Sequence, residues 1–146
     1  MKIHQLSVFV ENRPGQLLVP CRVLADAGIN IVTLSLADTK DFGILRLIVR
    51  DWQAARDALI AAGCVVNVTE VVAIEVEDRP GGLAAVLEMV TRAGINVEYM
   101  YAFLDKREDR GVLVFRFEDP DAALRALEGS AVSIIPGVEL YERLEG

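Results

Sequence analysis

The sequence is poor in the residues from which most catalytic and metal centres are built. Its 146 residues include one histidine, His4, and two cysteines, Cys21 and Cys64. The cysteines form no CxxC pair and are too few for a disulfide framework, which is typical of a reducing compartment. His4 has no cysteine or carboxylate at metal-ligand or triad spacing, so we expect it to be an exposed residue at a strand end. With no phosphate-binding glycine loop either, we predict no enzyme, no metal site and no cofactor.

Long apolar runs and an excess of positive charge are also missing. Charged residues interrupt the apolar stretches every few positions, so no segment approaches the roughly 20 apolar residues of a membrane span. The first residues alternate in polarity and do not resemble a secretory signal. The chain has 15 basic and 22 acidic residues, a net charge of −7, and no basic stripe. Such a surface repels a phosphate backbone. We therefore expect a cytoplasmic protein that binds neither membranes nor nucleic acid.

The sequence does contain a repeat. The segment NRPGQL begins at Asn12 and DRPGGL begins at Asp78, while Gly-Ile-Asn begins at Gly28 and again at Gly94. Both pairs have the same separation (78 − 12 = 94 − 28 = 66). Hydrophobic residues make up 53% of the chain, which is ample for a packed core. The repeat therefore predicts two similar folded copies in one chain.

Each copy shows the order strand, helix, strand, strand, helix, strand, read from alternation, helical spacing and turn residues. In the first copy the predicted strands are 3–10, 29–36, 44–49 and 65–68, and the helices lie between Leu17 and Gly28 and between Asp51 and Gly63. In the second the strands are 71–76, 95–103, 112–117 and 132–135, and the helices are 82–93 and a segment starting at Asp119-Pro120. The tail 138–144 could be strand or helix, and its alternation favours a strand.

A βαββαβ order is that of the ferredoxin-like split-βαβ motif, an antiparallel sheet with two helices on one face. The predicted fold class is therefore α+β, with two ferredoxin-like repeats at residues 1–69 and 70–146 that pack as a pseudo-dimer within one chain. Only Thr69 and Glu70 separate the last strand of one repeat from the first strand of the next. We therefore expect the two sheets to lie close together.

The repeated loops have the composition of a ligand site. Gly15 and Gly81 lie between a strand and a helix N-terminus, where unpaired backbone N–H groups and the helix dipole attract a carboxylate. Asn30 and Asn96 begin the next strand and offer an amide donor and acceptor. These residues are also common wherever a helix stops and a strand starts, so a purely structural role stays open.

Inside βαββαβ units of this length, the duplicated xRPGxL and Gly-Ile-Asn segments resemble the ACT domain family, here as a tandem pair over essentially the whole chain. The resemblance implies a small regulatory module that binds an amino acid at the interface between two copies and controls amino-acid metabolism. The match is close to the phosphoglycerate dehydrogenase type, in which the loop Asn and the Asn after the helix hold the ligand. Those positions correspond to Asn12 and Asn30, and to Asp78 and Asn96.

Two departures from that type affect the expected ligand. Val10 and Val76 stand where the serine-binding type has a histidine, which favours a more apolar amino acid. Asp78 replaces Asn12 in the second copy, where it would accept from an ammonium group but repel a carboxylate. We therefore expect the two loops to differ in affinity or ligand. Pro20 lies where the second copy has Val86 and predicts a distorted or late start of the first helix.

Two tyrosines distinguish the second copy. Thr33 and Ser35 correspond to Tyr99 and Tyr101, which could line a pocket, form a dimer contact or simply cover the sheet. The predicted ligand-binding residues are Asn12, Pro14, Gly15, Gln16, Leu17 and Asn30 in the first copy, and Asp78, Gly81, Gly82, Leu83, Asn96, Tyr99 and Tyr101 in the second.

These observations leave two functions open. The favoured one is an amino-acid-binding regulatory protein, with the ligand at an interface between ACT repeats, acting as a homodimer on a target enzyme or regulator. The alternative is a subunit that binds no ligand and serves to assemble with such a target. The replacement of Asn12 by Asp78 favours the alternative for the second loop, and the intact first loop favours ligand binding there.

Overall fold

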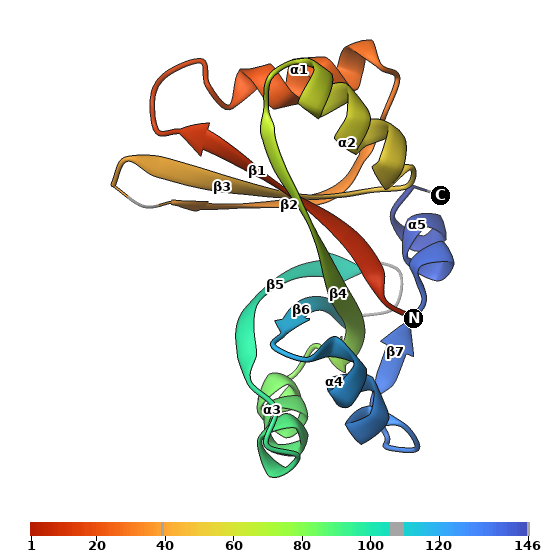
Figure 1. The fold of residues 1–146 in the computed structure, drawn as a ribbon. Helices are drawn as coiled ribbons and strands as arrows, with labels where there is room; N and C mark the ends of the chain where they lie inside the picture. The colour runs from red at the N-terminus through yellow and green to blue at the C-terminus, as the bar shows by residue number, and fades with distance from the viewer. Residues whose placement is uncertain (39, 106–109, 146) are drawn as a thin grey trace. The chain divides into compact units, whose positions relative to one another are not determined.

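The computed structural model describes residues 1–38, 40–105 and 110–145. The chain forms two compact units, which we describe separately (Figure 1). The first unit is His4–Thr69, and the second is Met1–Ile3 with Glu70–Gly146. Parts of both predicted hairpin turns, Thr39 and 106–109, lie outside the described residues.

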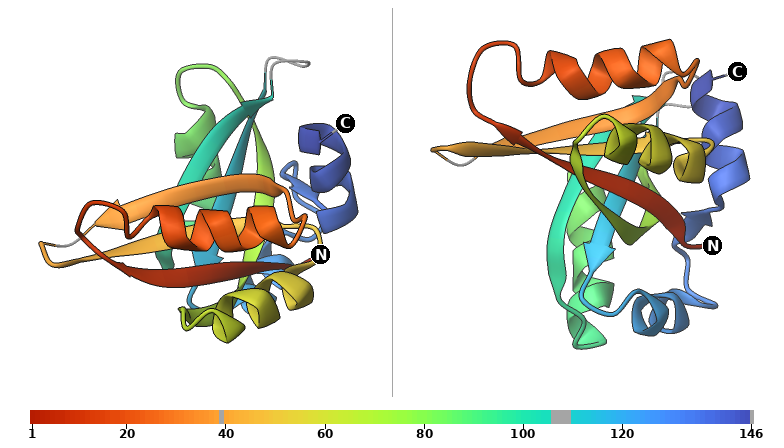
Figure 2. Two further views of the ribbon diagram at one scale, coloured as in Figure 1. Left: turned by 90° about the horizontal axis from the view of Figure 1, so that it is seen from above. Right: turned by 45° about the horizontal axis from the view of Figure 1, so that its top comes forward.

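The first unit is an antiparallel sheet with two helices on one face. Its elements are β1 (Ile3–Glu11), α1 (Leu18–Asp26), β2 (Ile31–Asp38), β3 (Phe42–Val49), α2 (Trp52–Ala61) and the first part of β4 (Val65–Glu77). The strand order is β2-β3-β1-β4, so β2 is an edge strand. The helices α1 and α2 lie side by side on the sheet (Figure 2). They bury Leu24 and Leu59 against alternate residues of β1 and β3, such as Leu6 and Leu47.

The second unit repeats this arrangement and adds a C-terminal helix. Its further elements are α3 (Gly82–Arg92), β5 (Val97–Asp105), β6 (Arg110–Phe117), α4 (Pro120–Leu127), β7 (Ser133–Ile135) and α5 (Gly137–Glu145). The strand order is β5-β6-β4, with β7 on the other side of β4, and each of these pairings is antiparallel. Phe115 and Phe117 are fully buried, with ring centroids 5.2 Å apart, in a core that includes Val86 and Val90 of α3. The predicted α+β class, with ferredoxin-like βαββαβ repeats, is confirmed.

Helix α2 and helix α4 begin at the predicted caps. The Asp51 carboxylate accepts from the Ala54 N–H at 3.1 Å, and the Asp119 carboxylate accepts from the Ala122 N–H at 3.0 Å. Each cap satisfies one of the backbone donors that a helix start leaves without a partner.

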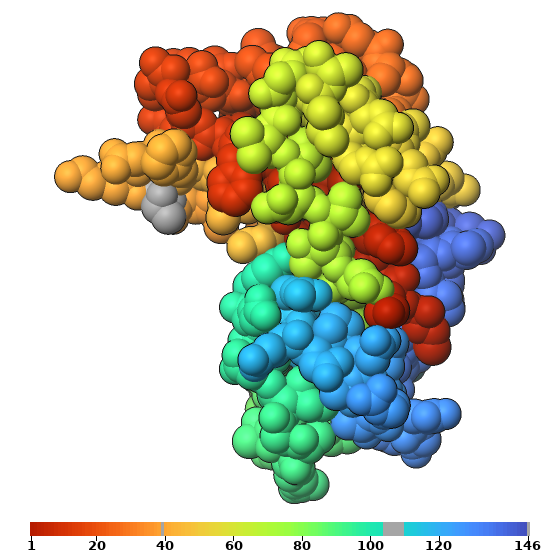
Figure 3. All heavy atoms as spheres, viewed as in Figure 1, coloured from red at the N-terminus to blue at the C-terminus, as the bar shows by residue number. Residues whose placement is uncertain are grey.

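The outer side of α2 lies at the surface of its unit (Figure 3).

Helix α1 begins late, as Pro20 predicts. By the 66-residue offset, the first residue of α3, Gly82, corresponds to Gln16, yet α1 begins at Leu18. Pro20 has no N–H to donate to the carbonyl of Gln16 four residues earlier, so an earlier helical turn would lack that bond. Pro20 is instead accommodated, buried, in the first turn of α1.

Three local expectations are wrong. Residues 138–144 are helical, because Leu140 is fully buried and the Leu140 N–H donates to the carbonyl of Pro136. The strands expected at 65–68 and 71–76 form the single strand β4, since no turn residue lies between them. His4 is half-buried and not fully exposed, because its ring stacks on Trp52 with centroids 4.4 Å apart.

Among the described residues, no helix is both long and apolar enough to cross a bilayer.

The Asp119 cap can be tested by substitution. We expect Asp119→Ala to lower the free energy of unfolding by about 1 kcal/mol, because it removes the acceptor of the Ala122 N–H. Urea unfolding followed by circular dichroism measures the change. Asp119→Asn keeps a side-chain oxygen and should stay within a few tenths of a kcal/mol of the parent. Equal losses in the two variants would contradict a capping role.

Candidate functional site

The first repeated loop borders a hollow of about 420 Å³ in the first unit. One wall is the loop between β1 and α1, and the other is the β2–β3 hairpin. Apolar side chains from Val10, Leu17 and Leu36 line it together with charged side chains from the loop and hairpin. The lining residues are Val10, Glu11, Asn12, Arg13, Pro14, Gly15, Leu17, Leu36, Asp38 and Gly43.

Backbone hydrogen bonds fix the shape of this loop. The Arg13 N–H donates to the carbonyl of Glu11 at 2.8 Å, and the Gln16 N–H donates to the carbonyl of Arg13 at 3.2 Å. Gly15 has φ = +86°, a conformation that side chains with a Cβ rarely adopt. The sequence Pro14-Gly15 therefore produces a tight turn directly before α1.

Asn12 ties the loop to the hairpin on the other side of the hollow. Its backbone N–H donates to the carbonyl of Asp41 at 3.0 Å, and its side-chain amide donates to the carbonyl of Lys40 at 3.4 Å. The two walls of the hollow are thus joined at one end by a single residue. Any ligand that contacts Asn12 would also affect these hydrogen bonds between the loop and the hairpin.

The floor of the hollow depends on a glycine of β3. A Cβ on Gly43 would lie 3.2 Å from Cγ2 of Val10 and 3.3 Å from Cδ1 of Leu36, tighter than ordinary contact. Gly43 therefore leaves the apolar surface of Val10 and Leu36 accessible. Leu36 is 49% exposed, so a ligand could still bury a large part of its side chain.

The start of α1 offers polar groups to the same region. Its N-cap residue, Leu17, makes no side-chain capping bond. Backbone N–H groups in the first turn of an uncapped helix carry the positive end of the helix dipole. Beside them, Arg13 forms an exposed ion pair with Glu11 at 2.5 Å. The hollow thus has an apolar floor, a helix start that adjoins it at Leu17, and charged side chains of both signs from Arg13, Glu11 and Asp38.

The second loop borders a corresponding but smaller hollow of about 260 Å³. The same turn is present, because the Arg79 N–H donates to the carbonyl of Glu77 at 2.9 Å and the Gly82 N–H to that of Arg79 at 3.0 Å. At the position of Leu36 the second unit has Ala102 (36 + 66 = 102). The lining residues are Val76, Glu77, Asp78, Arg79, Leu83, Ala102, Phe103, Gly111 and Leu113.

One glycine explains much of the difference between the loops. Gly82 is buried, and a Cβ there would overlap the carbonyl oxygen of Glu77. Its counterpart in the first loop is Gln16 (16 + 66 = 82). A residue with a side chain cannot approach the strand end so closely. The start of α3 therefore packs directly against the end of β4, whereas the first loop is extended by its late helix start.

The structure brings together only some of the predicted residues. Four of the first-copy residues line the first hollow: Asn12, Pro14, Gly15 and Leu17. Two of the second-copy residues line the second hollow: Asp78 and Leu83.

The remaining predicted residues lie outside these linings. Gln16 and Gly81 are in the loops, and Gly82 borders another hollow of about 200 Å³ beside β7. Asn30 and Asn96 are exposed just before β2 and β5. Tyr99 and Tyr101 are half-buried on β5, opposite Arg116 and Val114 of β6.

The hairpin contribution was missed by sequence reasoning. Leu36, Asp38 and Gly43, on the two strands of the hairpin, line the first hollow but were not predicted as site residues. Gly43 and Gly111 do correspond in the two copies, with an offset of 68 (111 − 43). That correspondence signals a shared structural need, but it does not indicate which loop the hairpin faces.

The described residues give no sign of a metal or thiol centre. Burial raises the pKa of the Cys64 thiol, which makes the reactive thiolate less populated. Within the described part of the chain, no three His, Cys, Asp or Glu residues are grouped to hold a metal ion.

Two such α+β units with paired loops define a class of protein, the tandem module with a ferredoxin-like fold. The chain belongs to the ACT domain pair family, whose model matches residues 1–141. Membership indicates a small-molecule-binding regulatory role.

Solved structures show the same fold. The chain is 37% identical to protein BT0572 from Bacteroides thetaiotaomicron, with a TM-score of 0.90 and 97% of each chain covered. It is 21% identical to the ligand-free regulatory subunit of aspartate kinase from Thermus thermophilus, with a TM-score of 0.60, covering 85% of this chain and 89% of that one. The corresponding subunit from Thermus flavus is 18% identical, with a TM-score of 0.59 and coverages of 87% and 92%. These two subunits support the fold alone. No curated protein matches the chain.

The different packing of the two loops can be tested at Gly82. We expect Gly82→Ala to lower the free energy of unfolding by about 1–3 kcal/mol, because the added methyl group overlaps the carbonyl of Glu77. Gln16→Ala, at the matching position of the first loop, should change it by about 0.5 kcal/mol or less. Chemical unfolding of both variants measures the difference. Similar effects at the two positions would show that the loops pack alike.

Proposed function

We propose that this protein is a regulatory sensor of a small apolar amino acid, which binds in the hollow beside the first repeated loop. The observation that supports this most strongly is the composition of the hollow: an apolar floor of Val10 and Leu36 next to an uncapped helix start. A free amino acid carries both an apolar side chain and a carboxylate, and these two surfaces match them.

In this proposal each part of the ligand has a partner. The α-carboxylate accepts from backbone N–H groups of the loop and the first turn of α1. The ammonium group is held by the Asn12 side-chain oxygen or by the carboxylate of Asp38. The side chain packs against Val10, Leu17 and Leu36. Because the ligand touches both the loop and the hairpin, binding changes the relative stability of the arrangements that these two segments adopt.

We further propose that the protein acts in the cytoplasm as a homodimer of two-repeat chains, divided at residues 1–69 and 70–146, with a target enzyme or regulator as its partner. The edge strand β2 exposes Leu34 and Leu36 by 51% and 49%, and an exposed apolar edge is a ready surface for pairing. Asn30 lies outside the first hollow, so in this proposal it reaches the ligand from another ACT repeat. Tyr99 and Tyr101 on β5 also lie outside the hollows, so we assign them to a contact with another ACT repeat.

The second loop favours a different role. Its hollow is smaller, it has Ala102 in place of Leu36, and Asp78 brings a carboxylate to the position of Asn12. We propose that this loop binds the amino acid more weakly or not at all. If neither loop binds, the protein is an assembly subunit, which is the alternative function.

A panel of the twenty amino acids tests the sensor directly. A ligand at about 100 times its dissociation constant should stabilise the protein by roughly 2.7 kcal/mol, which raises the melting temperature by several degrees. We expect such a shift with one of the apolar amino acids, measured by differential scanning fluorimetry. Size-exclusion chromatography with and without that ligand then reports on dimer formation. No shift with any of the twenty would support the assembly subunit instead.

The position of the site can be tested at Leu36. We expect Leu36→Ala, which introduces the residue of the second hollow, to weaken binding by about 1–2 kcal/mol, roughly 5- to 30-fold, because apolar contact is lost. Ile60→Ala is the control, since Ile60 is similarly exposed, at 53%, but lies on α2 and does not line the hollow. Isothermal titration calorimetry with the amino acid found above measures both. Equal affinities for the two variants would place the ligand elsewhere.

A further inference from the structure

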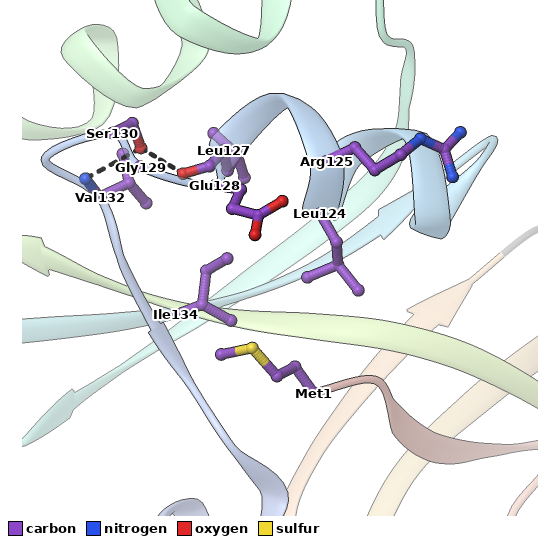
Figure 4. A pocket seen from close by; sticks show the side chains of 9 residues that line it. All are labelled: Met1, Leu124, Arg125, Leu127, Glu128, Gly129, Ser130, Val132 and Ile134. Atoms are coloured by element: carbon purple, nitrogen blue, oxygen red, sulfur yellow. Dashed lines mark hydrogen bonds between the residues drawn. The ribbon is translucent and has the colours of Figure 1, made fainter.

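A fourth hollow, of about 410 Å³, lies in the second unit between the end of α4 and β7 (Figure 4). It contains none of the residues of the repeated loops. Its walls are mainly apolar, from Leu124 and Leu127 of α4, Val132 and Ile134 of the β7 segment, and Met1. Its volume falls within the range of small-molecule sites. The lining also includes Arg125, Glu128, Gly129 and Ser130.

The turn that forms one wall is rigidly braced. The Ser130 hydroxyl donates to the carbonyl of Leu127 at 2.6 Å and accepts from the Val132 N–H at 3.2 Å. The Ser130 N–H also donates to the carbonyl of Leu127, at 3.1 Å. These bonds fix the chain between α4 and β7, so the hollow is formed before any ligand arrives. A preformed wall lowers the ordering cost of binding.

The hollow lies where the second helix of the two repeats differs in length. The caps of α2 and α4, Asp51 and Asp119, are 68 residues apart, but the glycines after these helices, Gly63 and Gly129, are only 66 apart. Helix α4 accordingly has 8 residues and α2 has 10. The shorter helix ends about half a turn earlier over the sheet.

Side chains along the two helices differ in the same region. Counted from the caps, Arg56 and Ile60 of α2 correspond to Leu124 and Glu128 in the second unit. At these two positions α2 has a charged residue and then an apolar one, whereas the second unit has an apolar residue and then a charged one. Leu124 and the Glu128 carboxylate are therefore beside the hollow. Leu124 packs against the core of its unit while also lining the hollow.

One carboxylate faces the hollow. The Glu128 carboxylate is directed toward the space between Leu124 and Ile134, whereas the guanidinium of Arg125 points away from it (Figure 4). Within the described residues, Glu128 makes no ion pair. A carboxylate at the mouth of an apolar hollow favours a ligand that combines an ammonium group with a hydrocarbon part.

We propose that the α4–β7 hollow binds a small apolar amine that has no carboxylate. The ammonium group donates to the Glu128 carboxylate, and the hydrocarbon part packs against Leu124, Val132 and Ile134. An amino acid is disfavoured here because its own carboxylate would lie near that of Glu128. This site is separate from the amino-acid hollow in both location and ligand class, and it does not depend on the function proposed above.

The test uses the full chain and three six-carbon probes: n-hexylamine, hexan-1-ol and hexanoate. Amide chemical shifts in two-dimensional NMR spectra report on binding. We expect hexylamine to shift the Gly129, Ser130 and Val132 amides and to bind about 2- to 5-fold tighter than hexanol, with hexanoate weakest. Equal binding of hexylamine and hexanol would refute the amine class, and unchanged amides with all three probes would refute the site.

Substitution of Glu128 separates the ion pair from general attraction to an acidic protein. Glu128→Gln should reduce hexylamine affinity to that of hexanol, without changing hexanol affinity. Glu142→Gln removes the same charge from an exposed position on α5 and should leave both affinities unchanged. Both side chains are exposed, and thermal unfolding confirms that the variants fold. Equal loss of hexylamine binding in the two variants would refute the assigned role of Glu128.

Discussion

Burial of one apolar stripe of each helix against one face of an antiparallel sheet is the interaction on which both units depend. Leu24 and Leu59 are buried in this way in the first unit, and Val86 and Leu127 in the second. Since both helices must cover the same sheet face, the chain has to turn sharply between the first strand and first helix of each repeat. The repeated loops are these turns. Their backbone lies at the end of a rigid core, so the loops can be exposed without exposing the core.

Duplication has allowed the two copies to diverge where the core does not constrain them. Gln16 and Gly82 occupy matching positions, but only glycine fits against the strand end in the second loop. Leu36 and Ala102 likewise match, and with them the hollow changes from about 420 to about 260 Å³. The same sheet and helices thus support two hollows of different size and lining, and fold similarity does not imply equal ligand binding.

Membership of the ACT domain pair family explains the architecture more fully than it explains the ligand. The fold is shared with regulatory subunits of aspartate kinase at about 20% identity, so most of the side chains at the hollows are free to differ. A regulatory response also needs only a modest coupling energy, typically 1–3 kcal/mol. A few contacts between the loop and the hairpin, such as those of Asn12 with Lys40 and Asp41, are of that order.

The sequence by itself determined the repeat, the α+β class, the helix starts at Asp51 and Asp119 and the late start of α1. These depend on local chemistry: periodicity, caps and the missing N–H of Pro20. It did not determine the continuous strand β4 or the helix α5, because strand pairing and the burial of Leu140 involve distant residues. The candidate site was likewise predictable only in part from the sequence. The loop was evident from its turn residues, but only the tertiary structure decided that the β2–β3 hairpin faces it, with Leu36 and Gly43 forming the floor, and that Asn30 lies outside.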